Sequence, residues 1–96
     1  MKYFHRTSVS PDDVMHHATN FFGARMSPAA EAPRLRQFAG TLGQVTLRVT
    51  AEGGHYTLVE VETDQVGESE VDKLAKRFLT TVHALAEPDH IVRGAY

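Results

Sequence analysis

The sequence of 96 residues contains no cysteine. Disulfide frameworks, thiolate nucleophiles, zinc ribbons and cysteine-ligated iron–sulfur clusters are therefore excluded. The sequence also lacks a long run of apolar residues, so we expect neither a signal peptide nor a membrane-spanning helix. A cytoplasmic protein is the expectation that follows.

Neither positive nor negative side chains are in strong excess. Ten Lys and Arg side chains stand against 12 Asp and Glu, which gives a formal charge of −2. Proteins that bind nucleic acid or a membrane surface usually carry a basic field, so we expect neither partner. The hydrophobic share of 42% is typical of a globular protein, and the length suits one domain over residues 1–96. Because a chain this short buries little of its surface, a second copy often completes the burial.

The motifs of common catalytic sites are missing as well. The sequence contains no G-x-S-x-G, no phosphate-binding loop, no dinucleotide fingerprint and no H-E-x-x-H. Six histidines are present, but His16 and His17 are adjacent, about 100° apart on a helix, and no histidine follows another at i+4. We therefore predict no catalytic residue, no metal site and no cofactor.

Local patterns predict a strand, a helix and a loop in the first third of the chain. Residues 2–9 are rich in strand-forming side chains and predict a strand. Ser10 suits the N-cap of a helix, Pro11 its first position, and Gly23 its end. Residues 24–33 contain two prolines and no period, so we expect a long loop there.

The remaining patterns predict three further elements. Residues 34–39 form a weak strand, and the Gly-Thr-Leu-Gly that follows suits a tight connection to a hairpin over 45–63. Ser69 and Asp72 resemble a capping box at the start of an amphipathic helix, which Pro88 ends. The outer face of this helix carries Lys73, Lys76 and Arg77, and we expect it to be a solvated surface. These three side chains are also the first place to test for an acidic partner.

The order of these elements predicts the fold class. Strand, helix, three strands and helix give β-α-β-β-β-α, with a short final strand possible in residues 90–96. Each helix has one apolar stripe, so both should cover the same face of an antiparallel sheet. We predict an α+β two-layer sandwich with about four strands and two helices on one face.

Two pairings of the hairpin are conceivable, and the burial of Glu60 distinguishes them. Pairing Thr50 with His55 would place Glu60 on the core face without a partner. Pairing Ala51 with His55 leaves Glu60 on the other face, and the glycines at 53 and 54 suit the three-residue turn. We predict this second pairing, which places Val45, Leu47 and Val49 opposite Val61, Val59 and Thr57.

The second face of the hairpin is the candidate site. Arg48 should lie diagonal to Glu60, close enough for an ion pair. Aromatic, leucine and arginine side chains gather beside this pair, and such residues mark interfaces. Alternation in the weak strand lets Arg34, Arg36 and Phe38 join them. The candidate interface or ligand-binding residues are Arg34, Arg36, Phe38, Arg48, Tyr56, Leu58 and Glu60.

Three interpretations of this face remain open. It is a solvated surface, an interface between two copies, or a site where Arg34, Arg36 and Arg48 hold a small acidic ligand. Our leading hypothesis is a non-catalytic interaction module that forms a homodimer through its open sheet face. The alternative is a protein that binds a small anionic molecule, or a minor enzyme, with its site between the sheet and the C-terminal helix.

The opening Tyr-Phe-His-Arg-Thr-Ser-Val-Ser-Pro-Asp-Asp-Val-Met, a strand that leads through a Ser-Pro cap into a helix, resembles the start of helix-grip domains of the polyketide-cyclase and START type. The long C-terminal amphipathic helix adds to the likeness. The chain departs from these domains because it has too few strands to enclose their large cavity, and it has no residue motif to carry over. The resemblance implies only that a ligand would lie between the second helix and a curled sheet.

Overall fold

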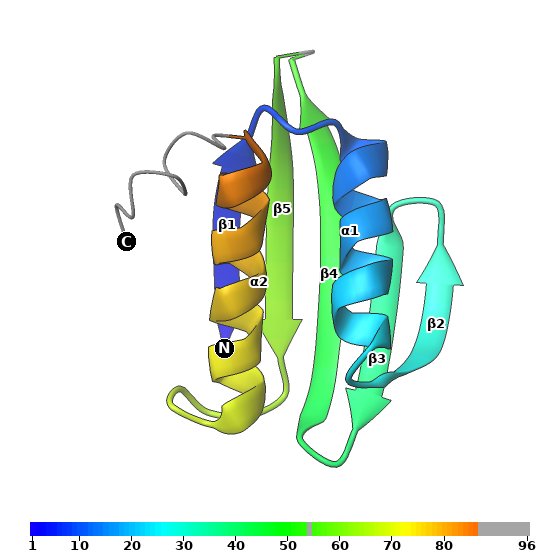
Figure 1. The fold of residues 1–96 in the computed structure, drawn as a ribbon, viewed down its shortest axis with the longest axis vertical. Helices are drawn as coiled ribbons and strands as arrows, with labels where there is room; N and C mark the ends of the chain where they lie inside the picture. Colours follow the sequence, from blue (N-terminus) through cyan, green and yellow to red (C-terminus); the bar gives the residue numbers. More distant parts are fainter. Residues whose placement is uncertain (54, 87–96) are drawn as a thin grey trace.

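The structure is a computed structural model, and it describes residues 1–53 and 55–86. Its strands form one antiparallel sheet in the order β1-β5-β4-β3-β2, and both helices lie on one face of that sheet (Figure 1). The α+β architecture and the placement of the helices are as predicted. The elements are β1 (Lys2–Thr7), α1 (Pro11–Gly23), β2 (Ser27–Ala32), β3 (Leu35–Gly40), β4 (Gly43–Glu52), β5 (Tyr56–Thr63) and α2 (Glu70–Ala86).

In the described part of the chain the sheet has five strands, against the predicted number of about four, because residues 24–33 are not only a loop. β2 lies within them and pairs with β3, with a shift of register between Pro28 and Ala30. All six residues of β2 are exposed, so no apolar alternation marks the strand. Proline is tolerated there because an edge strand has one side without partners. The predicted final strand at residues 90–96 lies outside the described residues.

Both helices begin with the predicted serine caps. The Ser10 hydroxyl accepts a hydrogen bond from the Asp13 amide at 3.2 Å, and the Ser69 hydroxyl accepts one from the Asp72 amide at 3.2 Å. The carboxylate of Asp72 does not complete a standard capping box with Ser69. It accepts the amide of Glu68 instead, at 3.3 Å, and Glu68 has a positive φ of 73°.

The core lies between the helices and the face of the sheet that they cover. Its apolar side chains alternate along the two central strands, with Val45, Leu47 and Val49 from β4 and Val59 and Val61 from β5. Aromatic rings from three elements fill the space above them: the Phe22 ring centroid lies 5.3 Å from that of Phe38 and 4.9 Å from that of Phe78.

The predicted faces of the hairpin are confirmed, but the predicted pairing is wrong. Val45 lies opposite Thr63, Leu47 opposite Val61 and Val49 opposite Val59. The strands extend further than expected, so that Glu52 pairs with Tyr56. Side chains alternate with a period of two, so this shift of two residues leaves every side chain on its predicted face. Arg48 consequently lies directly opposite Glu60 instead of diagonal to it.

The turn between β3 and β4 depends on a glycine. Gly40 pairs with Gly43, so only Thr41 and Leu42 form the connection, which is as tight as predicted. Gly43 has a φ of +138°, and an added Cβ would lie 2.6 Å from a carboxylate oxygen of Asp64. That same oxygen accepts the amide of Gln44 at 2.7 Å, so a larger residue at 43 would break this contact.

Replacement of Leu47 by Asp should prevent folding. Leu47 is fully buried, and an unpaired carboxylate at this place should remove more than about 4 kcal/mol of folding stability. Phe78→Asp should act in the same way. Circular dichroism and chemical denaturation measure the loss. The control is Thr50→Asp, which places the same charge on the exposed face of the same strand and should stay within about 1 kcal/mol of the wild type. A well-folded Leu47→Asp variant would contradict the assignment of the core face.

Candidate functional site

Within residues 1–53 and 55–86, no helix covers the face of the sheet opposite α1 and α2, which we call the open face. Cross-strand pairs show which side chains share it, because partners directly opposite each other point to the same face. On β1 they are Lys2, Phe4 and Arg6, which lie opposite Glu62, Glu60 and Leu58 of β5. The remaining members from the central strands are Gln44, Thr46, Arg48, Thr50, Glu52 and Tyr56.

The charges of this open face form ion pairs with one another. Arg48 contacts Glu60 at 3.4 Å and Glu62 at 3.7 Å, and Lys2 reaches Glu60 at 3.8 Å. Near the other end of the face, Nε of Arg6 donates to Glu52 at 2.8 Å. Such exposed pairs contribute little stability, typically 0–1 kcal/mol each. They do neutralise the basic side chains, so the open face offers no concentrated positive charge.

An apolar row crosses the same face. Phe4 is 59% exposed and Tyr56 is 58% exposed, and Leu58 lies between them, partly buried. Phe4 pairs with Glu60, so Leu58 is its diagonal neighbour two residues along β5. Two exposed aromatic rings and a leucine thus lie on a face that no described helix covers, and the Arg6–Glu52 ion pair crosses β5 between Leu58 and Tyr56.

The structure brings together four of the seven predicted site residues and separates the other three. Arg48, Tyr56, Leu58 and Glu60 lie on the open face. The expectation that Arg34, Arg36 and Phe38 join them is wrong.

The three displaced residues lie on the helix side because of the way β3 pairs with β4. Phe38 lies opposite Val45, is 1% exposed and packs against Phe22 in the core. Arg36 lies opposite the buried Leu47 and donates hydrogen bonds to the carbonyls of Ala32 and Leu35.

Arg34 contacts Asp12 of α1 at 3.4 Å, which also places it on the helix side. The open face receives Leu35 and Gln37 from β3 instead. The arginines at 34, 36 and 48 therefore do not converge, and the structure offers no acidic-ligand site built from all three.

The sequence interpretation missed Phe4. The alternation of side chains along the predicted first strand could have revealed it, because Phe4 points to the face opposite that of its neighbours Tyr3 and His5. Tyr3 and His5 lie opposite the buried Val61 and Val59, which places Phe4 on the other face.

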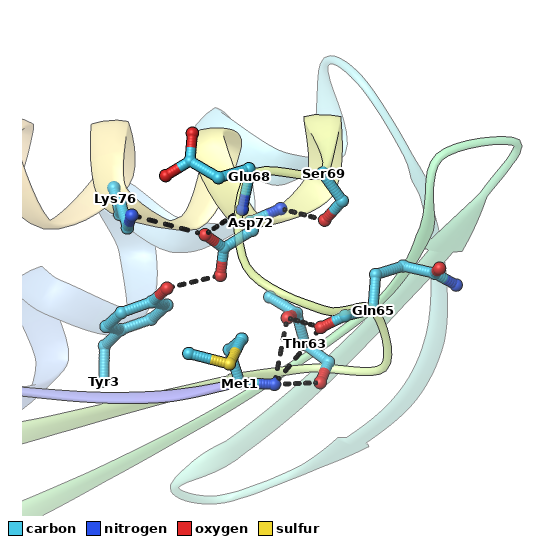
Figure 2. Close-up of polar contacts among 8 residues, drawn as sticks. All are labelled: Met1, Tyr3, Thr63, Gln65, Glu68, Ser69, Asp72 and Lys76. Atoms are coloured by element: carbon cyan, nitrogen blue, oxygen red, sulfur yellow. Dashed lines mark hydrogen bonds and ion pairs between the residues drawn. The ribbon is translucent and has the colours of Figure 1, made fainter.

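A buried carboxylate links β1 to the start of α2 (Figure 2). Asp72 is 0% exposed, and its Oδ1 accepts the Tyr3 hydroxyl at 2.5 Å. Its Oδ2 accepts the Glu68 amide at 3.3 Å and lies 3.4 Å from Nζ of Lys76.

The protonation of this group follows from its contacts. The hydrogen bond between the two side chains raises the pKa of Tyr3 and lowers the pKa of Asp72, and Asp72 in turn raises the pKa of Lys76. Near neutral pH the carboxylate is therefore ionised, the phenol is protonated and the amine is charged. The contacts make this network a structural link between β1 and the start of α2.

Histidines contact the C-terminal half of α2. His17 of α1 stacks on Phe78, with ring centroids 5.5 Å apart, and its Nε2 lies 2.7 Å from the Thr81 hydroxyl. That hydroxyl donates to the Phe78 carbonyl, so Nε2 of His17 carries the proton that it shares with Thr81. His5 of β1 meets His83 edge to face, with ring centroids 6.1 Å apart.

The described residues contain no group of three histidine, aspartate or glutamate side chains placed to hold a metal ion. None of the helices within residues 1–53 and 55–86 is long and apolar enough to cross a membrane.

The space between α2 and the sheet, where the resemblance placed a ligand, is filled. Phe78 and Val82 of α2 are fully buried in the same cluster as Val59 and Val61. A hollow of about 660 Å³ lies elsewhere, between the start of α1 and the end of α2. Its lining is Ser8, Val9, Ser10, Asp13, His16, His17, Asn20, Leu85 and Ala86.

No protein-family model, no curated protein and no solved structure matches this chain. We therefore infer function from the geometry of the described residues.

Replacement of Tyr3 by Phe should lower the midpoint of thermal unfolding by several degrees. The change removes the hydroxyl that Asp72 accepts and leaves that buried carboxylate short of a donor. The pKa of Asp72, followed by NMR, should rise in the same variant because the bond that lowers it is lost. Tyr56→Phe is the matched control, since the Tyr56 side chain is exposed on the open face. Equal stability of the two variants would contradict a structural role for the Tyr3 bond.

Stability should fall as the pH is lowered from about 7.5 to about 5.5. Burial lowers the pKa of His5 and of His17 below the ordinary value of 6.5, and the neighbouring His83 and His16 lower them further. The unfolded chain therefore binds protons first, so this stability is fully present above pH 6.5 and is lost below it. Chemical denaturation at several pH values measures the loss. A double variant His5→Gln with His17→Gln should show a flatter profile, and an unchanged profile would contradict this assignment.

Proposed function

We propose that this protein is a non-catalytic interaction module of the cytoplasm that forms a homodimer through the open face of its sheet. The observation that carries the proposal is the row of Phe4, Leu58 and Tyr56 on a face that no described helix covers. Aromatic side chains are enriched at interfaces, and burying a row of this kind favours association.

The size of the face supports a partner as large as a second copy. Five described strands at a spacing of about 4.8 Å, with about seven residues each at 3.3 Å, give a surface of roughly 24 by 24 Å. The projected area is then roughly 600 Å², and side chains enlarge it. A standard interface buries about 800 Å² on each partner, so one face against another approaches that size.

The balance of charge supports a second copy in particular. The face carries as many basic as acidic side chains, which are Lys2, Arg6 and Arg48 against Glu52, Glu60 and Glu62. In a symmetric dimer each surface meets itself, so only a neutral, mixed surface avoids net repulsion. A partner with a large net charge of one sign would find no complementary charge on this neutral face.

The same charges limit the affinity. The cores of interfaces are depleted in charged residues, and desolvating ion pairs costs free energy. We therefore expect the dimer to dissociate in the micromolar range. The alternative of a small acidic ligand at Arg34, Arg36 and Arg48 is not proposed, because these side chains point to opposite faces.

Sedimentation equilibrium over low to high micromolar concentrations tests this proposal. The wild type should shift from monomer to dimer, and Leu58→Asp or Phe4→Asp should remain monomeric because the added carboxylate would be buried without a partner. Thr80→Asp, on the exposed face of α2, is the control and should dimerise like the wild type. A wild type that stays monomeric throughout would overturn the proposal. A dimer that Leu58→Asp leaves intact would place the interface elsewhere.

A further inference from the structure

A small cavity lies on the helix side of the molecule, where three elements meet. It has a volume of about 250 Å³ and opens between the end of α1, the turn from β3 to β4 and the first two turns of α2. These three segments lie together at the lower end of the molecule in Figure 1. The lining residues are Arg25, Leu42, Glu70, Lys73, Leu74 and Arg77.

The lining concentrates positive charge on a chain that is negative as a whole. Three cations stand against the single carboxylate of Glu70, which gives the cavity a charge of +2 on a protein whose formal charge is −2. Glu70 lies 4.0 Å from Lys73, its one ion-pair partner among the described residues. Within the described part of the chain, no carboxylate lies within ion-pair distance of Arg25 or Arg77.

Arg25 is held in place before any ligand binds. One Nη donates to the Phe21 carbonyl at 2.7 Å, and the guanidinium carbon lies 4.3 Å from the centroid of the Phe21 ring. A guanidinium has five N–H donors, so most of them remain for an acceptor in the cavity. Because the side chain is already ordered, binding a ligand costs less conformational entropy.

The remaining lining is apolar. Leu42, at the tip of the β3–β4 turn, is 41% exposed, and Leu74 contributes a buried side chain of α2. A ligand with an apolar group beside its charge would cover this surface and gain from its burial.

We propose that this cavity binds a phosphate monoester that carries a short apolar group. A phosphate monoester bears a charge of about −1.5 to −2 at pH 7, which matches the +2 of the lining. Arginine forks suit the tetrahedral oxygens of phosphate and bind them in pairs. The cavity is smaller than the range of about 300–1,000 Å³ that holds drug-sized ligands, so the apolar group is short.

Titration with butyl phosphate, followed by NMR at concentrations where the protein is monomeric, tests this site. The amide signals of Arg25, Lys73 and Arg77 should shift. Arg77→Gln should weaken binding about ten-fold or more, since it removes a charge-assisted hydrogen bond. Glu70→Gln should strengthen binding, because it removes the one negative charge of the lining. No shift at millimolar butyl phosphate would overturn the proposal.

Matched controls separate the site from general charge effects. Arg34→Gln removes one positive charge outside the cavity, from a side chain paired with Asp12, and should leave the affinity unchanged. If it weakens binding as much as Arg77→Gln does, the binding is not specific to the cavity and the proposal fails.

Two further arms test the two parts of the ligand. Inorganic phosphate should bind more weakly than butyl phosphate, and Leu42→Ser should remove that difference. Equal binding in the wild type would overturn the apolar part. Succinate should bind more weakly than butyl phosphate, and equal affinity would overturn the choice of phosphate. Because no residue of the cavity lies on the open face, these results are independent of the dimer.

Discussion

The architecture depends on one constraint: the two central strands bury side chains on one face only. Val45, Leu47 and Val49 of β4 lie beside Val59 and Val61 of β5, and all five are almost completely excluded from water. Both helices must cover that face, since burying apolar surface is the main favourable contribution to folding. Neither described helix then covers the opposite face, so the location of the candidate interface is a consequence of where the core is.

The core face could be predicted from the sequence, while the pairing of its strands could not. The face that carries Glu60 cannot be the core face, because a buried carboxylate without a partner is too costly. A shift of two residues between the strands leaves every side chain on the same face, so burial does not distinguish the two pairings. The two glycines after Glu52 fit more than one turn, so they did not determine the pairing. The Gly-Thr-Leu-Gly sequence, in contrast, does determine how β3 pairs with β4. A two-residue turn there pairs Gly40 with Gly43 and thereby places Phe38 opposite Val45, in the core.

Other features left no pattern in the sequence. β2 buries nothing, so its pairing with β3 is carried by the backbone, and no side-chain period reveals it. The basic cavity joins Arg25, Leu42 and Arg77, which come from three separate elements and meet only in the folded chain. The bond from Tyr3 to Asp72 spans 69 positions in the same way. Sequence patterns report local geometry and alternation, and these contacts depend on neither.

The position of β1 has a consequence for synthesis of the chain. It precedes the other described strands in the sequence, yet among them it pairs only with β5. Translation at about 5–20 residues per second separates Thr7 from Tyr56 by roughly 2–10 s. During this interval β2, β3 and β4 can form their hairpins in order. β1, with Tyr3 and Phe4, remains unpaired until β5 has been made. The described sheet can therefore close at this edge only after β5 has left the exit tunnel.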